Sequence, residues 1–199
     1  MKIAVVDVGL GNVKSVINML DWLGMDARSA HQPSVETDSS AIILPGVGAF
    51  DVGVSKLGDS GWFEYLQVQP PDKPILGICL GMQLLGVSSE EGHMMGLGRV
   101  NANFRRLPSG ELPVPHMGWH EVETKGNDPI FAEGESRYYF THSYYGTCDD
   151  PTDTIAVSRY GIEFVAAYRV GSTVGVQFHP EKSHAYGTEL LERWYQSIC

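Results

Sequence analysis

Three short apolar runs in the first half of the chain limit its fold more than any other feature. They are "KIAVVDV" from Lys2, "AIILP" from Ala41 and "PILGI" from Pro74. Each run is nearly continuous, which is typical of a strand buried on both faces of a parallel sheet. Residues at helical spacing follow the first run up to Gly24, and helical material around residues 62–66 precedes the third. Strands alternating with helices predict an α/β fold with a mostly parallel central sheet flanked by helices.

The second half of the chain has a different pattern. We expect its short runs, separated by turn residues, to add an antiparallel strand region to the sheet. A closing helix is expected over residues 188–198. No linker or repeat divides the 199 residues, so we expect a single domain over residues 1–199. The expected strands are "RVNANF", "HMGWHEVE", "RYYFTHS", "TIAVSRY", "IEFVAAY" and "STVGVQF".

Composition narrows the possible partners and compartments. A net charge of -10 argues against nucleic acid and anionic membrane surfaces. No apolar stretch approaches the roughly 20 residues of a membrane span, and the start is interpreted as a core strand, not a signal peptide. The three cysteines form no C-x-x-C pair, which favours a reducing cytoplasm over a disulfide framework. Because ligand clusters and complete nucleotide-binding motifs are missing from the sequence, we expect no metal and no cofactor.

A single cysteine stands where the third apolar run turns into a helix-like segment. Gly77 and Gly81 flank Cys79 two residues away on each side, which is the spacing of a nucleophile elbow. Such a corner requires a strained backbone and small neighbours, because strand and helix pass close together. It favours the thiolate near a helix N-terminus and directs the N–H of Leu80 toward a developing oxyanion. The alternative is a buried structural cysteine in a glycine-containing loop.

The best candidate for a base lies a hundred residues further on, in "VGVQFHPEKS". His179 and Glu181 are two residues apart, immediately after an apolar strand. In an extended segment they project to the same side, so Glu181 could hold the ring of His179 while its other nitrogen faces a thiol. A surface turn is the alternative for H-P-E taken alone. Together with the elbow at Cys79, the His179–Glu181 pair would complete a Cys–His–Glu arrangement suited to acyl transfer.

With these residues in hand, the chain resembles the triad-type (class I) glutamine amidotransferases. More closely, it resembles the family of glutaminase subunits of imidazole glycerol phosphate synthase, an enzyme of histidine biosynthesis. The resemblance runs from end to end, with the motifs in the family's order and spacing. The motifs are "DVGLGNVKSV", "LPGVGAF", "GICLGMQLL", "SSEEG", "GLGRV", "PHMGWH", "YFTHSYY" and "QFHPEKS".

The resemblance implies a role for each residue of the candidate triad. Cys79 would attack the side-chain amide of glutamine, His179 would protonate the departing ammonia, and Glu181 would orient His179. Water would then hydrolyse the glutamyl thioester. The oxyanion would accept hydrogen bonds from the N–H of Leu80 and from one N–H of the "PGVG" segment, around Val47 or Gly48.

The same resemblance implies residues for binding the amino-acid part of glutamine. They are Gln83, Glu91 and the backbone of Ser143 and Tyr144. Glu91 is a reasonable counter-charge for the substrate ammonium group, although a solvated glutamate is the alternative interpretation of "SSEEG".

The family's partner is a cyclase subunit with a (β/α)8 barrel, which receives ammonia through an internal channel in a heterodimer. The chain itself has no room for an ammonia-using domain, so the acceptor must be another chain. Positions that match the family's docking face are Asn12, Trp119, Tyr139 and Lys182. For Trp119 and Tyr139, simple core packing remains the alternative, since aromatic residues are frequent in both cores and interfaces.

A few positions depart from the family pattern. His120 stands where the family usually has Asn, and Gly86–Val87 replace a bulky aromatic–acidic pair. These departures leave open a paralogous ammonia-donating subunit of a surface-sugar pathway. Three more functions compete with the glutaminase subunit: a different ammonia donor, such as the pyridoxal phosphate synthase glutaminase, a stand-alone cysteine hydrolase, and a non-catalytic interaction module.

Overall fold

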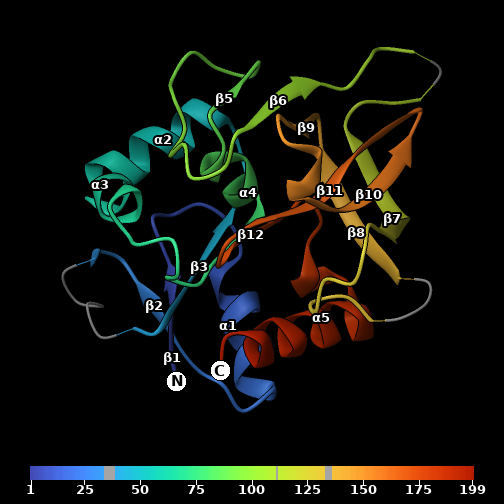
Figure 1. Ribbon diagram of the computed structural model, residues 1–199. Helices are drawn as coiled ribbons and strands as arrows, with labels where there is room; N and C mark the ends of the chain where they lie inside the picture. Colours follow the sequence, from blue (N-terminus) through green and yellow to red (C-terminus); the bar gives the residue numbers. More distant parts are fainter. Residues whose placement is uncertain (34–38, 111, 133–135) are drawn as a thin grey trace.

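The computed structural model describes residues 1–33, 39–110, 112–132 and 136–199 (Figure 1). In order along the chain, the elements are β1 (Lys2–Val6), α1 (Val13–Trp22), β2 (Asp26–Ala30), β3 (Ala41–Gly46), α2 (Phe50–Asp59), α3 (Trp62–Gln67), β4 (Ile75–Cys79), α4 (Leu80–Leu85), β5 (Ser88–Ser89), β6 (Ala102–Arg106), β7 (His116–Thr124), β8 (Ser136–His142), β9 (Tyr144–Cys148), η2 (Pro151–Asp153), β10 (Thr154–Tyr160), β11 (Ile162–Val170), β12 (Thr173–Val176), η3 (Pro180–Lys182) and α5 (His184–Ser197).

Four strands from the first half of the chain and β12 from the second form the parallel part of the sheet. Strands β2, β1, β3, β4 and β12 lie side by side in that order, and every pair among them is parallel. Strands β3 and β4 are buried along their whole length, as their continuous apolar runs predict. The predicted α/β fold with a mostly parallel central sheet is therefore confirmed.

Helices cover both faces of this parallel part. In Figure 1, α1 and α5 lie on one side of the sheet and α2, α3 and α4 on the other. Apolar side chains of α1 and α5, such as Leu20 and Trp194, join one buried cluster. Side chains of α2, α3 and α4, such as Phe50, Trp62 and Leu84, join a second cluster on the opposite face. The sheet is thus sandwiched between two apolar cores, which is the layered arrangement expected of an α/β domain.

The second half adds antiparallel strands, as predicted, but one expected strand differs in direction. Strands β11, β10, β7 and β8 continue the sheet beyond β12 with antiparallel pairing. Strand β12 itself is antiparallel to β11 and parallel to β4. The expectation that "STVGVQF" belongs to the antiparallel region therefore holds for its pairing with β11 and is wrong for its pairing with β4. All four residues of β12 are buried, because the strand lies at the junction of the two halves.

Two helices also differ from expectation. Helix α5 begins at His184, four residues before the predicted start, because the turn η3 leads directly into it. Helix α2 is not among the helices expected from the sequence, and it contains Gly53 and Gly58. At Gly53, an added Cβ would lie 3.0 Å from the side chain of Leu84, so this glycine lets α2 approach α4 closely. No helix in the described ranges is both long and apolar enough to cross a membrane.

Candidate active site

Cys79 occupies a strained corner between β4 and α4. It is the last residue of β4 and the N-cap of α4, and its φ of 54° lies in the left-handed region that side chains rarely adopt. A Cβ on Gly77 would lie 2.7 Å from the carbonyl oxygen of Gly81, and a Cβ on Gly81 would lie 1.7 Å from that of Leu44. Both glycines are therefore required sterically, and the predicted strand-to-helix elbow is confirmed as a backbone feature.

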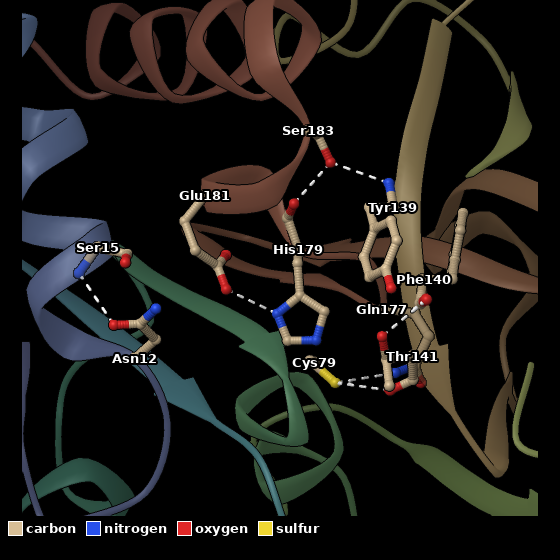
Figure 2. A network of polar contacts seen from close by, with 10 residues as sticks. All are labelled: Asn12, Ser15, Cys79, Tyr139, Phe140, Thr141, Gln177, His179, Glu181 and Ser183. Carbon is tan, nitrogen blue, oxygen red and sulfur yellow. Dashed lines mark hydrogen bonds and ion pairs between the residues drawn. The ribbon is translucent and has the colours of Figure 1, made fainter. Parts of the chain in front are cut away.

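His179 and Glu181 form a buried hydrogen-bonded pair beside this corner (Figure 2). Nδ1 of His179 lies 2.7 Å from Oε1 of Glu181, and both side chains are almost completely buried. The segment is not extended, in contrast to the expectation from its sequence. Pro180–Lys182 form a 3-10 turn, and this turn folds the Glu181 carboxylate back onto the ring. The contact predicted from the i, i+2 spacing is thus present, with a different backbone conformation.

The environment of His179 favours its protonated form. Burial lowers the pKa of His179, but a thiolate at Cys79 and the carboxylate of Glu181 outweigh this and raise it to about 10. The ring's Nε2 has no hydrogen-bond partner within the described residues, and Cys79 lies beside the ring in Figure 2. An imidazolium next to a thiolate is the arrangement that activates a cysteine nucleophile.

Strand β8 fixes the segment that carries His179. The N–H of His179 donates to the carbonyl oxygen of Tyr139 at 2.9 Å. Ser183 Oγ donates to the carbonyl oxygen of His179 at 2.6 Å and accepts from the N–H of Tyr139 at 3.0 Å (Figure 2). Sequence reasoning missed Ser183, because no motif marks a serine that bridges two segments so far apart in the chain.

Two further groups adjoin the thiol. Sγ of Cys79 lies 3.7 Å from the carbonyl oxygen of Thr141, to which its protonated thiol form can donate, and Nε2 of Gln177 donates to Sγ at 3.8 Å. Gln83 Nε2 in turn donates to Gln177 Oε1 at 3.1 Å and to the carbonyl oxygen of Tyr144 at 3.4 Å. Sequence reasoning missed Gln177 as well. The signal was present, since Gln177 lies two residues before His179 and residues at that spacing share one side of an extended segment.

A cavity of about 320 Å³ opens above the elbow. It brings together the candidate nucleophile and base, the three oxyanion candidates and the four candidates for glutamine binding, whereas Glu181 lies behind His179. The lining residues are Val47, Gly48, Cys79, Leu80, Gln83, Glu91, Pro115, Thr141, His142, Ser143, Tyr144, His179 and Lys182.

Val47 and Gly48 lie on the segment between β3 and α2. Val47 is exposed, and Gly48 has a φ of +111°, which only glycine adopts without strain. Leu80, the third oxyanion candidate, is the first residue of α4 and is buried. The sequence thus placed all three candidates on segments that line the cavity.

Glu91 is tied to the start of α2. Its Oε2 accepts the N–H of Phe50 at 2.8 Å. In return, the carboxylate of Asp51 accepts the N–H groups of His93 and Met94, at 3.0–3.1 Å. These backbone hydrogen bonds hold the pKa of Asp51 below its usual range. Hydrogen bonds in both directions therefore join the loop that carries Glu91 to α2, the helix that follows Val47–Gly48.

Of the four docking-face candidates, Lys182 lines the cavity, and the other three are partly or fully exposed. Trp119 is 36% exposed and stacks on His184, with ring centroids 5.5 Å apart. Lys182 Nζ lies 5.8 Å from the ring centroid of half-buried Tyr139. Asn12 is exposed, and its side chain accepts the N–H of Ser15 at the start of α1. Core packing, the alternative for Trp119 and Tyr139, does not describe these partly exposed rings.

The residues that depart from the family pattern, Gly86, Val87 and His120, have the following surroundings in the fold. Gly86 follows the last residue of α4, where an added Cβ would lie 2.7 Å from the carbonyl oxygen of Ala102. The N–H of Val87 donates to that same carbonyl at 2.8 Å. His120 lies on β7 with its ring against His116, at a centroid separation of 4.3 Å.

The part of the chain that the structure describes contains no group of three His, Cys, Asp or Glu residues arranged to hold a metal ion. Cys79, Cys148 and Cys199 are all free thiols. The cavity is lined by a thiol, an imidazole, the charged side chains of Glu91 and Lys182, and hydrogen-bonding groups around them.

Comparison with known proteins gives a consistent result. The family model "Glutamine amidotransferase class-I" matches residues 4–197. The chain is 41% identical over 199 residues to imidazole glycerol phosphate synthase subunit HisH 2 of Methanococcus maripaludis, covering 96% of this chain and 98% of the relative. It is also 41% identical over 201 residues to subunit HisH 2 of Pseudomonas aeruginosa, covering 98% and 100%.

Solved structures show the same fold at lower sequence identity. A crystal structure titled glutamine amidotransferase aligns with a TM-score of 0.76 at 18% identity, covering 98% of this chain and 97% of that one. A chain of the PurLQS structure from Thermotoga maritima aligns with a TM-score of 0.72 at 17% identity, covering 100% and 99%.

Proposed function

The chain belongs to the class-I glutamine amidotransferase family and, within it, to the HisH subunits of imidazole glycerol phosphate synthase, and from this premise we propose that it is the glutaminase subunit of such a synthase. It hydrolyses glutamine to glutamate and ammonia in the cavity above the elbow. The observation that carries the proposal is the juxtaposition of Cys79 with the buried His179–Glu181 pair at the base of that cavity.

The first half of the reaction forms a thioester. The thiolate of Cys79 attacks the side-chain amide carbon of glutamine, and the carbonyl electrons move onto the oxygen. His179, protonated in the resting pair, gives its proton to the amide nitrogen as the C–N bond breaks and ammonia leaves. Glu181 accepts a hydrogen bond from Nδ1–H of His179, which leaves Nε2 as the nitrogen that exchanges protons.

The second half returns the enzyme to its starting state. His179, now neutral, takes a proton from a water molecule that attacks the thioester carbon. The C–S bond breaks, glutamate leaves, and the thiolate is restored beside an imidazolium. In both halves the negative oxygen is stabilised by the N–H of Leu80 and by one from the Val47–Gly48 segment.

The remaining cavity residues recognise the amino-acid part of glutamine. Glu91 supplies a negative charge for the substrate ammonium group, and Gln83 and the backbone of Ser143 and Tyr144 supply hydrogen-bonding groups. All four line the same cavity as Cys79, which supports this assignment.

The ammonia passes to a second chain. We assign this role to a cyclase subunit with a (β/α)8 barrel, which docks around Asn12, Trp119, Tyr139 and Lys182 and forms a heterodimer. The cyclase uses ammonia to convert the phosphoribulosyl formimino intermediate to imidazole glycerol phosphate and aminoimidazole carboxamide ribotide, in histidine biosynthesis. A reduced thiol nucleophile suits the cytoplasm, which we propose as the compartment.

Ammonia release from glutamine tests this function. It is measured with the purified chain alone, with a histidine-pathway cyclase, and with cyclase plus its nucleotide ligand. We expect little release alone and a large rise with cyclase and ligand. Full activity of the isolated chain would instead identify an autonomous hydrolase.

Two variants separate the chemistry from the partner. Cys79→Ala is expected to abolish release while leaving folding and cyclase binding intact, and Cys199→Ser, at an exposed thiol, serves as the matched control. Residual release by Cys79→Ala would exclude Cys79 as the nucleophile. If Cys79 reacts with a glutamine-like alkylating agent but no cyclase of this pathway raises turnover, the partner is a paralogue, as in a surface-sugar pathway.

A further inference from the structure

A pair of buried histidines is hydrogen-bonded to the wall of the glutamine cavity. His116 on β7 is 0% exposed and His142 on β8 is 6% exposed. His116 Nδ1 lies 2.9 Å from His142 Nε2, and His142 Nδ1 lies 2.8 Å from the carbonyl oxygen of Tyr144. Neither ring has a part in the acyl-transfer steps, so their role requires another explanation.

The hydrogen-bond partners determine where each ring carries its proton. A carbonyl oxygen only accepts, so Nδ1 of His142 must donate to Tyr144. Burial lowers the pKa of His142 to about 4 and that of His116 to about 3, and both rings are therefore neutral. A neutral imidazole has one N–H, so Nε2 of His142 accepts and Nδ1 of His116 donates to it.

The surrounding aromatic rings hold His116 in this orientation. It stacks on Tyr160 with ring centroids 4.1 Å apart and on Phe140 with centroids 5.0 Å apart. Its Nε2 has no partner among the residues that the structure describes. An apolar side chain would fill this space without leaving a buried acceptor unpaired, so packing alone does not explain a histidine here.

The histidine pair acts on the backbone of Tyr144 through a hydrogen bond. Its carbonyl oxygen accepts from His142 on one side and from Gln83 Nε2 on the other. Gln83 also donates to Gln177, and Gln177 donates to Sγ of Cys79. The Ser143–Tyr144 backbone is thereby held in one position relative to the nucleophile.

We infer that His142, oriented by His116, is a positioning residue that preforms the glutamine-binding backbone at Ser143–Tyr144. The inference rests on the proposed function, since it concerns how that site binds its substrate. Without the donor from His142, the Tyr144 carbonyl keeps only Gln83 as a side-chain partner, and the segment is held less tightly, by Gln83, by the pairing of β9 with β6 and by the N–H of Leu107, which donates to the carbonyl oxygen of Ser143. Substrate affinity falls, because the cost of ordering the segment is then met at each binding event.

Two substitutions at His142 separate positioning from packing. His142→Leu removes the N–H donor and fills the space with an apolar side chain. His142→Asn places an amide N–H near the position of Nδ1. In the complex with cyclase, we expect Leu to raise the KM for glutamine by roughly tenfold with a smaller change in kcat. Asn is expected to restore the KM to within about twofold. An unchanged KM in a folded His142→Leu protein would overturn the inference.

A second measurement does not depend on turnover. The concentration of a glutamine-like alkylating agent that gives half of the maximal labelling rate of Cys79 reports the affinity of the cavity for that agent. If the wild-type chain labels but never releases ammonia, the proposed function fails while this comparison still tests the role of His142. Equal half-maximal concentrations for wild type and His142→Leu would again contradict it.

The tautomers give a test on the unmodified protein. Nitrogen NMR of the histidine-labelled chain should show both His116 and His142 as neutral Nδ1–H tautomers near pH 7. This readout keeps the inference testable even if His142→Leu does not fold. Finding His142 as the Nε2–H tautomer, or protonated at that pH, would remove the hydrogen bond on which the inference depends.

Discussion

The buried histidine pair should make the stability of the protein depend on pH in a specific way. The pKa of His142 is lowered from 6.5 to about 4, and that of His116 from 6.5 to about 3. In the unfolded chain both rings return to the ordinary value. Below pH 6.5 the two rings therefore bind protons in the unfolded state but remain neutral in the folded state until the pH approaches 4. The free energy of unfolding falls as pH falls.

The magnitude follows from these pKa values. Between pH 7 and pH 5 the unfolded chain gains most of one proton at each ring, while the folded chain gains almost none. Each ring taken by itself then lowers the free energy of unfolding by about 2 kcal/mol. The two values are not added, because the rings share a hydrogen bond and titrate as a coupled pair.

A comparison between variants separates this effect from that of titrating groups elsewhere in the protein. Urea unfolding at pH 7 and pH 5 is followed by tryptophan fluorescence and circular dichroism for the wild type, His116→Asn and His142→Asn. Asparagine supplies an N–H without titrating. The loss of stability between the two pH values should therefore be smaller by about 2 kcal/mol in each variant than in the wild type.

His179 has the opposite sign and cancels in this comparison. Because its pKa is raised to about 10, its contribution is fully present below pH 6.5 and is lost as pH rises through about 10. His179 is present in all three proteins. An identical loss of stability in the wild type and both variants would refute the reasoning, since it would mean that the two rings are protonated as easily in the folded state as in the unfolded state.

Three further substitutions and one control variant test the glutamine site and the backbone that supports it. Glu91→Gln should raise the KM for glutamine more than it lowers kcat, and an unchanged KM in steady-state assays would place Glu91 outside the substrate's ammonium site. Gly81→Ala should prevent folding, measured by soluble yield and circular dichroism, because its Cβ would lie 1.7 Å from the carbonyl oxygen of Leu44. Gly58→Ala, in α2 with open space around it, is the matched control and should stabilise the protein by about 0.5–1 kcal/mol. Asp51→Ala should raise the KM several-fold by releasing the loop that carries Glu91, and thermal unfolding distinguishes this from a general loss of stability.

The nucleophile elbow was the part of the site most open to prediction. Its requirements are local: a strained residue at the corner and two glycines, each two residues away. The sequence displays these directly, and the positive φ of Cys79 together with the steric limits at Gly77 and Gly81 agree with it. Backbone sterics over five residues leave few alternatives, so a short pattern is informative here.

The His179–Glu181 contact shows where local reasoning gives the right pair for an incomplete reason. The spacing placed the two side chains together, but a 3-10 turn, not an extended segment, makes the contact. Strand β12 is similar. Its apolar run indicated a buried strand but not its direction, because hydrophobicity is the same read either way along a sheet.

The sequence by itself determined the layered α/β fold, the corner at Cys79 and the residue types that could act with it. Only the tertiary structure decided that Trp119 is partly exposed, that Gln177 reaches the thiol, and that His116 and His142 form one hydrogen-bonded pair. The physical reason is range. Strain and periodicity act between neighbours in the chain and leave a readable pattern. A hydrogen bond between residues 26 or 98 positions apart exists only once the sheet has brought their strands together.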